Sequence, residues 1–185
     1  MSNRNFPAWA WTPVVFVVDF VSKRIVLAHE EVLRRKIEIL GELLRFSYVR
    51  NPGSAMGLFP VGRTVLVSVS ILASLFLVYL FFTTDRRMGL RRGAMAAILG
   101  GALGNLVDRL FYGGLVVDFI DIGIGTHRFY TFNVADMGVT IGGALLFLSL
   151  LRESFAGSEP DTPNVAPEAN RATAPEIGES RDETI

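Results

Sequence analysis

The chain has 185 residues, of which 50% are hydrophobic, and its 18 basic and 18 acidic residues give a formal net charge of zero. This composition is too apolar for a soluble domain of this length and indicates an integral membrane protein, while the balanced charge gives no sign of a nucleic-acid partner. The absence of cysteine excludes disulfides and thiolate chemistry, and two histidines without an HExxH motif argue against a zinc protease of that kind.

Residues 11–28 form the first predicted membrane span, since eighteen helical residues reach about 27 Å. A cleaved signal peptide is the alternative, but Asp19 interrupts the apolar run and no A-x-A cleavage site follows. Asp19 and Lys23 are four residues apart with the acid first, so they can pair on one helix face. The pair either neutralises itself inside a helix bundle or supports a nearby site, and the spacing leaves both roles open.

Residues 29–60 are too polar to span a bilayer and predict a small β platform on the membrane surface. Two short strands, 37–40 and 43–49, flank a Gly41-Glu42 turn. Alternation in the second strand predicts one apolar and one polar face, with Phe46 and Tyr48 opposite Arg45 and Ser47. Residues 51–54 then have proline and glycine where a type II turn requires them.

Residues 61–82 are the second predicted span, with Arg63 as the only charge. The short loop that follows, 83–92, contains four arginines, and short loops dense in arginine stay in the cytoplasm. This loop predicts that both termini are cytoplasmic and that residues 29–60 and 112–130 lie outside. The segment 29–60 also carries five basic residues, so we base the topology on the shorter loop, in which four arginines outnumber one aspartate.

Residues 93–111 are the third predicted span, and Gly100 and Gly104 form a GxxxG motif that allows another helix to approach closely. Asn105, Asp108 and Arg109 share one face of this helix. The fourth span, 132–151, follows an outer loop at 112–131. It carries a stripe of polar and small residues that must face protein rather than lipid: Asn133, Asp136, Met137, Thr140 and Gly143.

Residues 152–185 are rich in Ala, Glu, Pro, Thr and Ser, which predicts a disordered cytoplasmic tail. The remaining residues, 1–151, form the predicted membrane domain. The predicted fold class is therefore an all-α membrane protein with four transmembrane helices and a small extracytoplasmic β platform.

Asp118 and Asp136 are predicted to lie at the same outer membrane level. A charge at bilayer depth costs at least ~2.5 to 3.5 kcal/mol, so such carboxylates are candidates for function. Two carboxylates in one apolar site tend to share a proton, which is the arrangement that aspartic proteases use without a metal or a covalent intermediate. A proton-coupled transporter and a purely structural role remain open on spacing alone.

Five sequence blocks occur in a fixed order between residues 11 and 151: DFVSK at 19–23, NPGSAMG at 51–57, GNLVDR at 104–109, VVDFID at 116–121 and FNVADMGVTIGG at 132–143. Together they resemble the bacterial lipoprotein signal peptidase family, also called signal peptidase II. The resemblance implies a multi-pass, four-helix aspartyl endopeptidase of the inner membrane, with its active site near the outer face. Such an enzyme cleaves prolipoproteins before the diacylglyceryl-modified cysteine, contacts membrane lipid, is inhibited by globomycin-type compounds and needs no metal or other cofactor.

By resemblance, Asp118 and Asp136 match the catalytic aspartates of the family. The residues that match its substrate-binding or supporting positions are Asp19, Asn51, Asn105, Asp108, Arg109 and Asn133. Asp108 is expected to be a structural partner rather than a third catalytic acid, and Asp121 a solvated loop carboxylate. The chain departs from the family pattern at Met56, where a phenylalanine is usual, and in a slightly longer gap between GNLVDR and VVDF.

Overall fold

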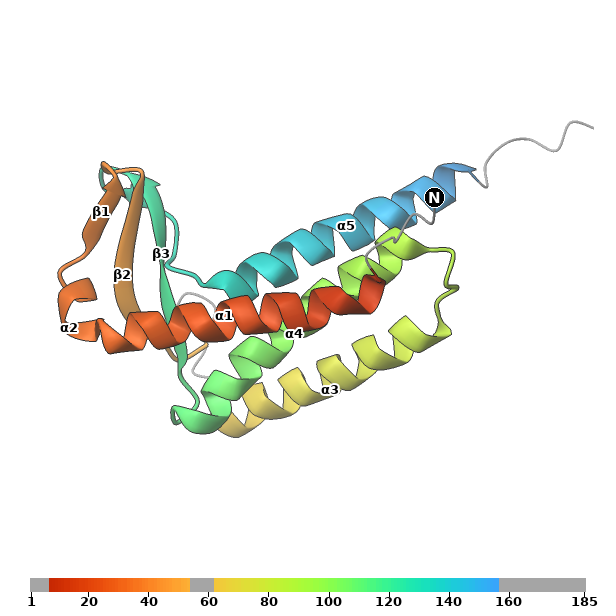
Figure 1. Ribbon diagram of the computed structural model, residues 1–185, viewed down its shortest axis with the longest axis horizontal. Helices are drawn as coiled ribbons and strands as arrows, with labels where there is room; N and C mark the ends of the chain where they lie inside the picture. Colours follow the sequence, from red (N-terminus) through yellow and green to blue (C-terminus); the bar gives the residue numbers. More distant parts are fainter. Residues whose placement is uncertain (1–6, 54–61, 157–185) are drawn as a thin grey trace, which may run out of the picture.

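The computed structural model describes residues 7–53 and 62–156. In this part of the chain, four long helices lie along one another and a small antiparallel sheet stands at one end of them (Figure 1). The elements in order are η1 Ala8–Ala10, α1 Trp11–Ala28, α2 Glu30–Leu33, β1 Ile37–Leu40, β2 Leu44–Asn51, α3 Arg63–Thr83, α4 Gly89–Phe111, β3 Val116–Ile124, β4 His127–Arg128 and α5 Val134–Ala156.

Helix α4 lies at the centre of the bundle and packs against α1, α3 and α5. Many of its buried residues are small, among them Gly93, Ala94, Ala96 and Gly100, so the other helices can approach its backbone. The predicted GxxxG motif serves this purpose. A Cβ at Gly100 would lie 2.6 Å from the carbonyl oxygen of Thr12 in α1, and one at Gly104 would collide with the carboxylate of Asp19.

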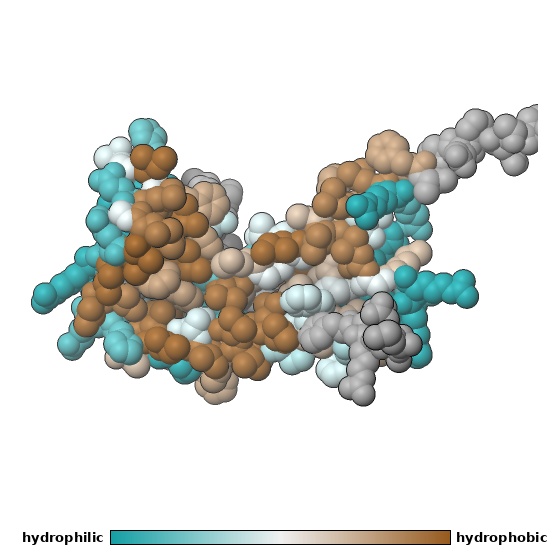
Figure 2. All heavy atoms as spheres, turned by 45° about the horizontal axis from the view of Figure 1, so that its top comes forward, coloured by the Kyte–Doolittle hydropathy of each residue, from teal (hydrophilic) through white to brown (hydrophobic). Residues whose placement is uncertain are grey.

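Three of the described helices, α3, α4 and α5, are long and apolar enough to cross a membrane. Helix α1 has eighteen residues but includes Asp19, Lys23 and Arg24, so composition alone does not make it a span. The four-span prediction is therefore supported for three helices and stays a prediction for α1. Figure 2 shows apolar side chains over the middle of the molecule and polar ones gathered toward its two ends.

Helix α5 runs to Ala156, beyond the predicted end at Leu151. The assignment of residues 152–156 to the disordered tail is therefore wrong. The side chain of Glu153 pairs with Arg91 near the start of α4, which ties the last turns of α5 to the bundle. The remaining predicted tail, 157–185, lies outside the described residues, as do Ser54 of the predicted turn and Met56.

The sheet has the strand order β1-β2-β3-β4, with every neighbouring pair antiparallel. The predicted strands at 37–40 and 43–49 are confirmed, but the predicted outer loop at 112–131 contains the inner strand β3. The alternation of apolar and polar residues could not reveal this strand, because its first four residues, 116–119, are all buried. A strand covered on both faces has no alternating pattern.

A bulge interrupts the pairing of β2 with β3 between Phe46 and Val49. Because of it Ser47 and Tyr48 are both buried, while Phe46 is 36% exposed. The predicted alternation of this strand into one apolar and one polar face is therefore wrong. Tyr48 joins a core that fixes the sheet to the end of α1 and to α2, formed with Val26, Leu33, Val117 and Phe119.

The close approach at Gly100 generates a test of helix packing. Gly100→Ala should lower the free energy of unfolding by about 1 to 3 kcal/mol, because the added methyl meets backbone atoms of α1. Gly143→Ala in α5 is the matched control, since a Cβ there meets nothing within 4 Å and should add up to about 1 kcal/mol through helix propensity. Thermal unfolding in detergent micelles measures both. Equal midpoints for the two variants would contradict the packing described here.

Candidate active site

A cavity of about 790 Å³ lies where the sheet meets the helices. Five of the eight predicted site residues line it: Asn51 from β2, Asn105 and Arg109 from α4, Asp118 from β3 and Asp136 from α5. Its other walls are largely apolar and include Ala102 and Val139, with Ser70 contributed by α3. A mostly apolar cavity with a few convergent polar groups is the usual form of a ligand or active site.

Asp136 is held at the start of α5 by a reciprocal pair of hydrogen bonds. The backbone N–H of Asp136 donates to Asn133 Oδ1 at 2.9 Å, and the backbone N–H of Asn133 donates to Asp136 Oδ2 at 3.1 Å. This is a capping box, which satisfies two backbone donors that a helix start leaves free. Asn105 Nδ2 donates to the other carboxylate oxygen of Asp136 at 2.8 Å, so both oxygens are fixed.

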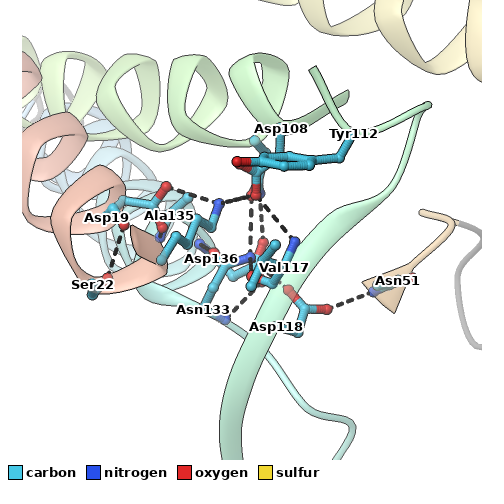
Figure 3. Close-up of polar contacts among 12 residues, drawn as sticks. Asp19, Ser22, Asn51, Asp108, Tyr112, Val117, Asp118, Asn133, Ala135 and Asp136 are labelled. Carbon is cyan, nitrogen blue, oxygen red and sulfur yellow. Dashed lines mark hydrogen bonds and ion pairs between the residues drawn. The ribbon is translucent and has the colours of Figure 1, made fainter. Parts of the chain in front are cut away.

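Asp118 is 1% exposed and lies on β3 between two amide side chains. Asn51 Nδ2 donates to one carboxylate oxygen at 2.8 Å and Asn133 Nδ2 to the other at 2.6 Å. Burial raises the pKa of Asp118 from 3.8 to about 7, against the opposing effect of the hydrogen bond from Asn51, and the charge of Asp136 adds to the rise. Asn133 therefore bonds to both aspartates, to the side chain of Asp118 and to the backbone N–H of Asp136; Figure 3 labels all three residues.

A buried ion cluster adjoins the residues that line the cavity, and Figure 3 shows two of its members, Asp19 and Asp108. The ammonium group of Lys23 is 2.8 Å from Asp19 Oδ2 and 3.0 Å from Asp108 Oδ2. Asp19 also accepts a hydrogen bond from the backbone N–H of Ala135, and Asp108 accepts one from the backbone N–H of Val117. The cluster thus joins α1, α4, β3 and α5, and its buried charges are paired, as burial requires.

The predicted Asp19–Lys23 pair is thus present, and Asp108 is its third member. Asp19, Asp108 and Asn133 do not line the cavity but lie behind it. The sequence indicated Lys23 only as the partner of Asp19, and it was not among the predicted site residues. The DFVSK block and the acid–base spacing contained it, yet only the fold shows that it reaches α4.

Arg109 lines the cavity beside the two aspartates. Within residues 7–53 and 62–156 its guanidinium makes no hydrogen bond, and its buried Nε has no partner. The side chain lies against Gly53, where an added Cβ would come 3.3 Å from Nη2. Gly53 has φ +76°, the left-handed conformation expected for the glycine of the predicted turn. The site therefore holds a cation whose donors have no hydrogen-bond acceptor among the described residues.

Asp121 is not the solvated loop carboxylate that the sequence predicts. It is 4% exposed, lies on β3 and accepts a hydrogen bond from Arg128 Nε at 2.7 Å. It is three residues from Asp118, so the two carboxylates point to opposite faces of the sheet. Asp121 balances a partly buried arginine and lies outside the cavity.

In the described parts of the chain, no three His, Asp or Glu side chains form a group that could hold a metal ion. We therefore assign no metal ligand among these residues. The acidic and amide groups at the cavity hold one another instead, through the hydrogen bonds given above.

The raised pKa of Asp118 predicts how stability depends on pH. Because the folded chain holds this proton more tightly than the unfolded chain, the stabilisation is complete below about pH 4 and is lost as the pH rises through about 7, with an upper limit on the order of 4 kcal/mol. Asp118→Asn removes this contribution. Between about pH 5 and about pH 8, the thermal midpoint of the parent should therefore fall more than that of the variant.

Glu31→Gln is the control for this measurement, because it is also a carboxyl-to-amide change but at an exposed position. Its midpoint should follow that of the parent. Parallel pH curves for the parent and Asp118→Asn would show that burial does not favour the protonated form of Asp118.

Comparison with known proteins gives consistent matches. Residues 11–152 match the family model described as signal peptidase (SPase) II. A lipoprotein signal peptidase of Symbiobacterium thermophilum is 40% identical over 138 residues, which cover 75% of this chain and 90% of the relative. One of Photorhabdus laumondii is 33% identical over 159 residues, which cover 83% and 91%.

Two solved structures have the same fold. A bacterial membrane enzyme determined by the in meso method at 2.3 Å resolution superposes with a TM-score of 0.74 at 29% identity, covering 83% of this chain and 92% of that one. A second, determined at 1.9 Å resolution, has a TM-score of 0.70 at 31% identity, covering 79% and 93%.

Proposed function

Because the chain belongs to the signal peptidase II family, whose members are proteases that process lipoproteins, we propose that it is an intramembrane aspartyl endopeptidase. Its substrates are diacylglyceryl-modified prolipoproteins, and it cleaves the signal peptide just before the lipid-modified cysteine. The observation that carries the proposal is the placement of Asp118 and Asp136 in one cavity, with Asn133 bonded to both.

Hydrolysis then follows the chemistry of two carboxyl groups that share a proton. Asp118, whose burial favours the protonated form at neutral pH, donates its proton to the oxygen of the scissile carbonyl. Asp136 takes a proton from a water molecule as that water attacks the carbonyl carbon. Asp136 returns the proton to the leaving nitrogen as the C–N bond breaks, and Asp118 recovers its own from the tetrahedral intermediate.

The remaining cavity residues hold the substrate in this scheme. Among the described residues the donors of Arg109 have no acceptor, and they can bind backbone carbonyls of the extended peptide, while Asn51 and Asn105 fix the two carboxyl groups. Asp19, Asp108 and Asn133 support these groups from behind the cavity. Globomycin-type inhibitors would occupy the same cavity.

The diacylglyceryl group requires an apolar surface beside the aspartates. A second pocket of about 310 Å³ shares Tyr130, Asp136 and Thr140 with the main cavity, and its other walls are apolar: Phe129, Phe132, Met137 and Ile141. An acyl chain placed here would lie next to the scissile bond. The arrangement supports a lipid-modified rather than an unmodified peptide as the substrate.

We place the protein in the bacterial inner membrane, and we propose that α1 crosses it in addition to α3, α4 and α5. Asp19 and Lys23 are turned into the protein, at 0% and 1% exposure, whereas the exposed side chains of α1 are largely apolar: Val14, Val17, Val18, Val21 and Ile25. The arginine loop between α3 and α4 lies at the end of the bundle opposite the sheet, near the start of α1 and the end of α5 (Figure 1). A cytoplasmic loop then puts both termini inside and the aspartates near the outer face.

The central test replaces each aspartate by its amide. Asp118→Asn and Asp136→Asn should each lower the cleavage rate at least ~10²-fold, because an amide cannot exchange a proton in either role. The double variant should be little worse than either single one, since groups that act as a unit are not additive. A gel-shift assay with a purified diacylglyceryl prolipoprotein measures all three.

Glu31→Gln is the control here also, and it should cleave at the parental rate. Asp121→Asn is unsuitable, because Asp121 is bonded to Arg128. If either aspartate variant cleaves at near the parental rate while accumulating normally, the proposed mechanism is wrong. If the parent does not cleave, the proposed function itself fails.

Arg109→Lys tests the role of this guanidinium group. Lysine keeps the charge, but its compact ammonium group is carried on a flexible chain. The guanidinium of arginine is planar and presents several donors in a fixed geometry. The variant should raise KM or lower kcat by about tenfold or more in total, as expected when an oriented charged hydrogen bond is lost. Full activity of Arg109→Lys would show that only a positive charge is needed at this position.

A further inference from the structure

We propose that Lys23 is a positioning residue for the reaction, which orients the side-chain amide of Asn105 and through it the carboxylate of Asp136. Lys23 Nζ donates to Asn105 Oδ1 at 2.9 Å, and Asn105 Nδ2 donates to Asp136 Oδ1 at 2.8 Å. The inference rests on the proposed function, since it assigns Asp136 a part in catalysis. Lys23 itself does not line the cavity.

The direction of this chain of hydrogen bonds follows from the donors that lysine has. A lysine ammonium has three protons and no acceptor, so an amide that faces it must present its oxygen. The nitrogen of the same amide must then point the other way, which in Asn105 is toward Asp136. An amide turned by 180° would oppose its oxygen to the carboxylate of Asp136 and its NH₂ group to the ammonium.

Three side-chain oxygens lie within 3.0 Å of the Lys23 ammonium nitrogen. Asp19 Oδ2 at 2.8 Å and Asp108 Oδ2 at 3.0 Å form ion pairs with it, and Asn105 Oδ1 at 2.9 Å accepts its hydrogen bond. The side chain is 1% exposed, so water does not compete for the ammonium protons. The ammonium is therefore held between two carboxylates by ion pairs, and its hydrogen bond to Asn105 is shielded from water.

Asn133 does not fix Asn105 to the same extent. Its NH₂ group has two protons but three oxygens within reach: Asp118 Oδ1 at 2.6 Å, Asn105 Oδ1 at 3.1 Å and the carbonyl of Val117 at 3.4 Å. The short contact to Asp118 takes one of them. Without Lys23, the groups behind Asn105 are the carboxylates of Asp19 and Asp108, which attract an amide NH₂ rather than an amide oxygen.

The alternative is that Lys23 only neutralises Asp19 and Asp108. Removing Lys23 alone would not distinguish the two roles, because two unpaired buried carboxylates would destabilise the fold. The informative variant is the neutral pair Asp19→Asn with Lys23→Met. It removes one charge of each sign, and the amide oxygen introduced by Asp19→Asn can still accept from the backbone N–H of Ala135.

The assay measures kcat and KM for cleavage of a diacylglyceryl prolipoprotein by the purified pair variant. A positioning role predicts a kcat at least about tenfold lower, with KM within about threefold of the parent, since the orientation of a catalytic group changes and the cavity walls do not. The parent, assayed beside it, must cleave; an inactive parent would refute the proposed function and not this inference alone.

A double-mutant cycle with Asn105→Ala supplies the decisive readout. Alanine has no amide to orient, so the pair variant should lower kcat no further in that background, within about twofold. Parental kcat in the pair variant, a loss confined to KM, or losses that multiply in the Asn105→Ala background would each overturn the proposal.

A second neutral pair, Asp108→Asn with Lys23→Met, serves if the first does not accumulate in the membrane. The same kcat loss is expected, because the donor to Asn105 is again absent. If neither pair folds, the role of Lys23 is structural and the proposal is wrong.

Discussion

The ammonium group of Lys23 is enclosed by oxygens of three side chains, and the geometry of the cavity depends on that enclosure. A buried charge must have partners on every side that can bond to it. Here the partners also bond onward, Asp19 to the start of α5 and Asp108 to β3. The elements that carry the two candidate catalytic aspartates are thus both attached to one cation on α1. The same contacts therefore neutralise the buried charges and align the site.

At the start of α5, residues that stabilise the fold also form part of the site. Asn133 and Asp136 form the capping box that begins the helix, yet the same two side chains also contact Asp118 and Asn105. A helix start leaves backbone N–H groups without partners, and in most proteins a cap has no other task. In this chain the cap is also part of the candidate catalytic group, which keeps Asp136 in one conformation before any substrate binds.

The sequence was sufficient for those parts of the fold that depend on local pattern. The apolar runs predicted α3, α4 and α5 to within a few residues over the described range, and GxxxG predicted the contact at Gly100. Strand β3 was not predicted, because burial on both faces removes the alternation of apolar and polar residues. The bulge between Phe46 and Val49 reversed the expected orientation of the Ser47 side chain. Asp121 was misjudged because its partner, Arg128, is in reach only after β3 and β4 pair. The contact between Lys23 and Asn105 joins residues 82 positions apart, and no local pattern encodes it.

The bulge in β2 divides that strand into two parts with different tolerance to change. Between the bulge and the end of the strand, Asn51 pairs with Val116 and Val49 with Asp118, so the side chains have a fixed facing. A residue inserted there would turn Asn51 to the opposite face and remove its bond to Asp118. On the other side of the bulge lies the β1–β2 hairpin, whose turn at Gly41 has open space around it. Insertions at that turn leave the register at Asp118 intact, so the hairpin can vary in length among related chains, or carry an inserted tag, without disturbing the aspartates.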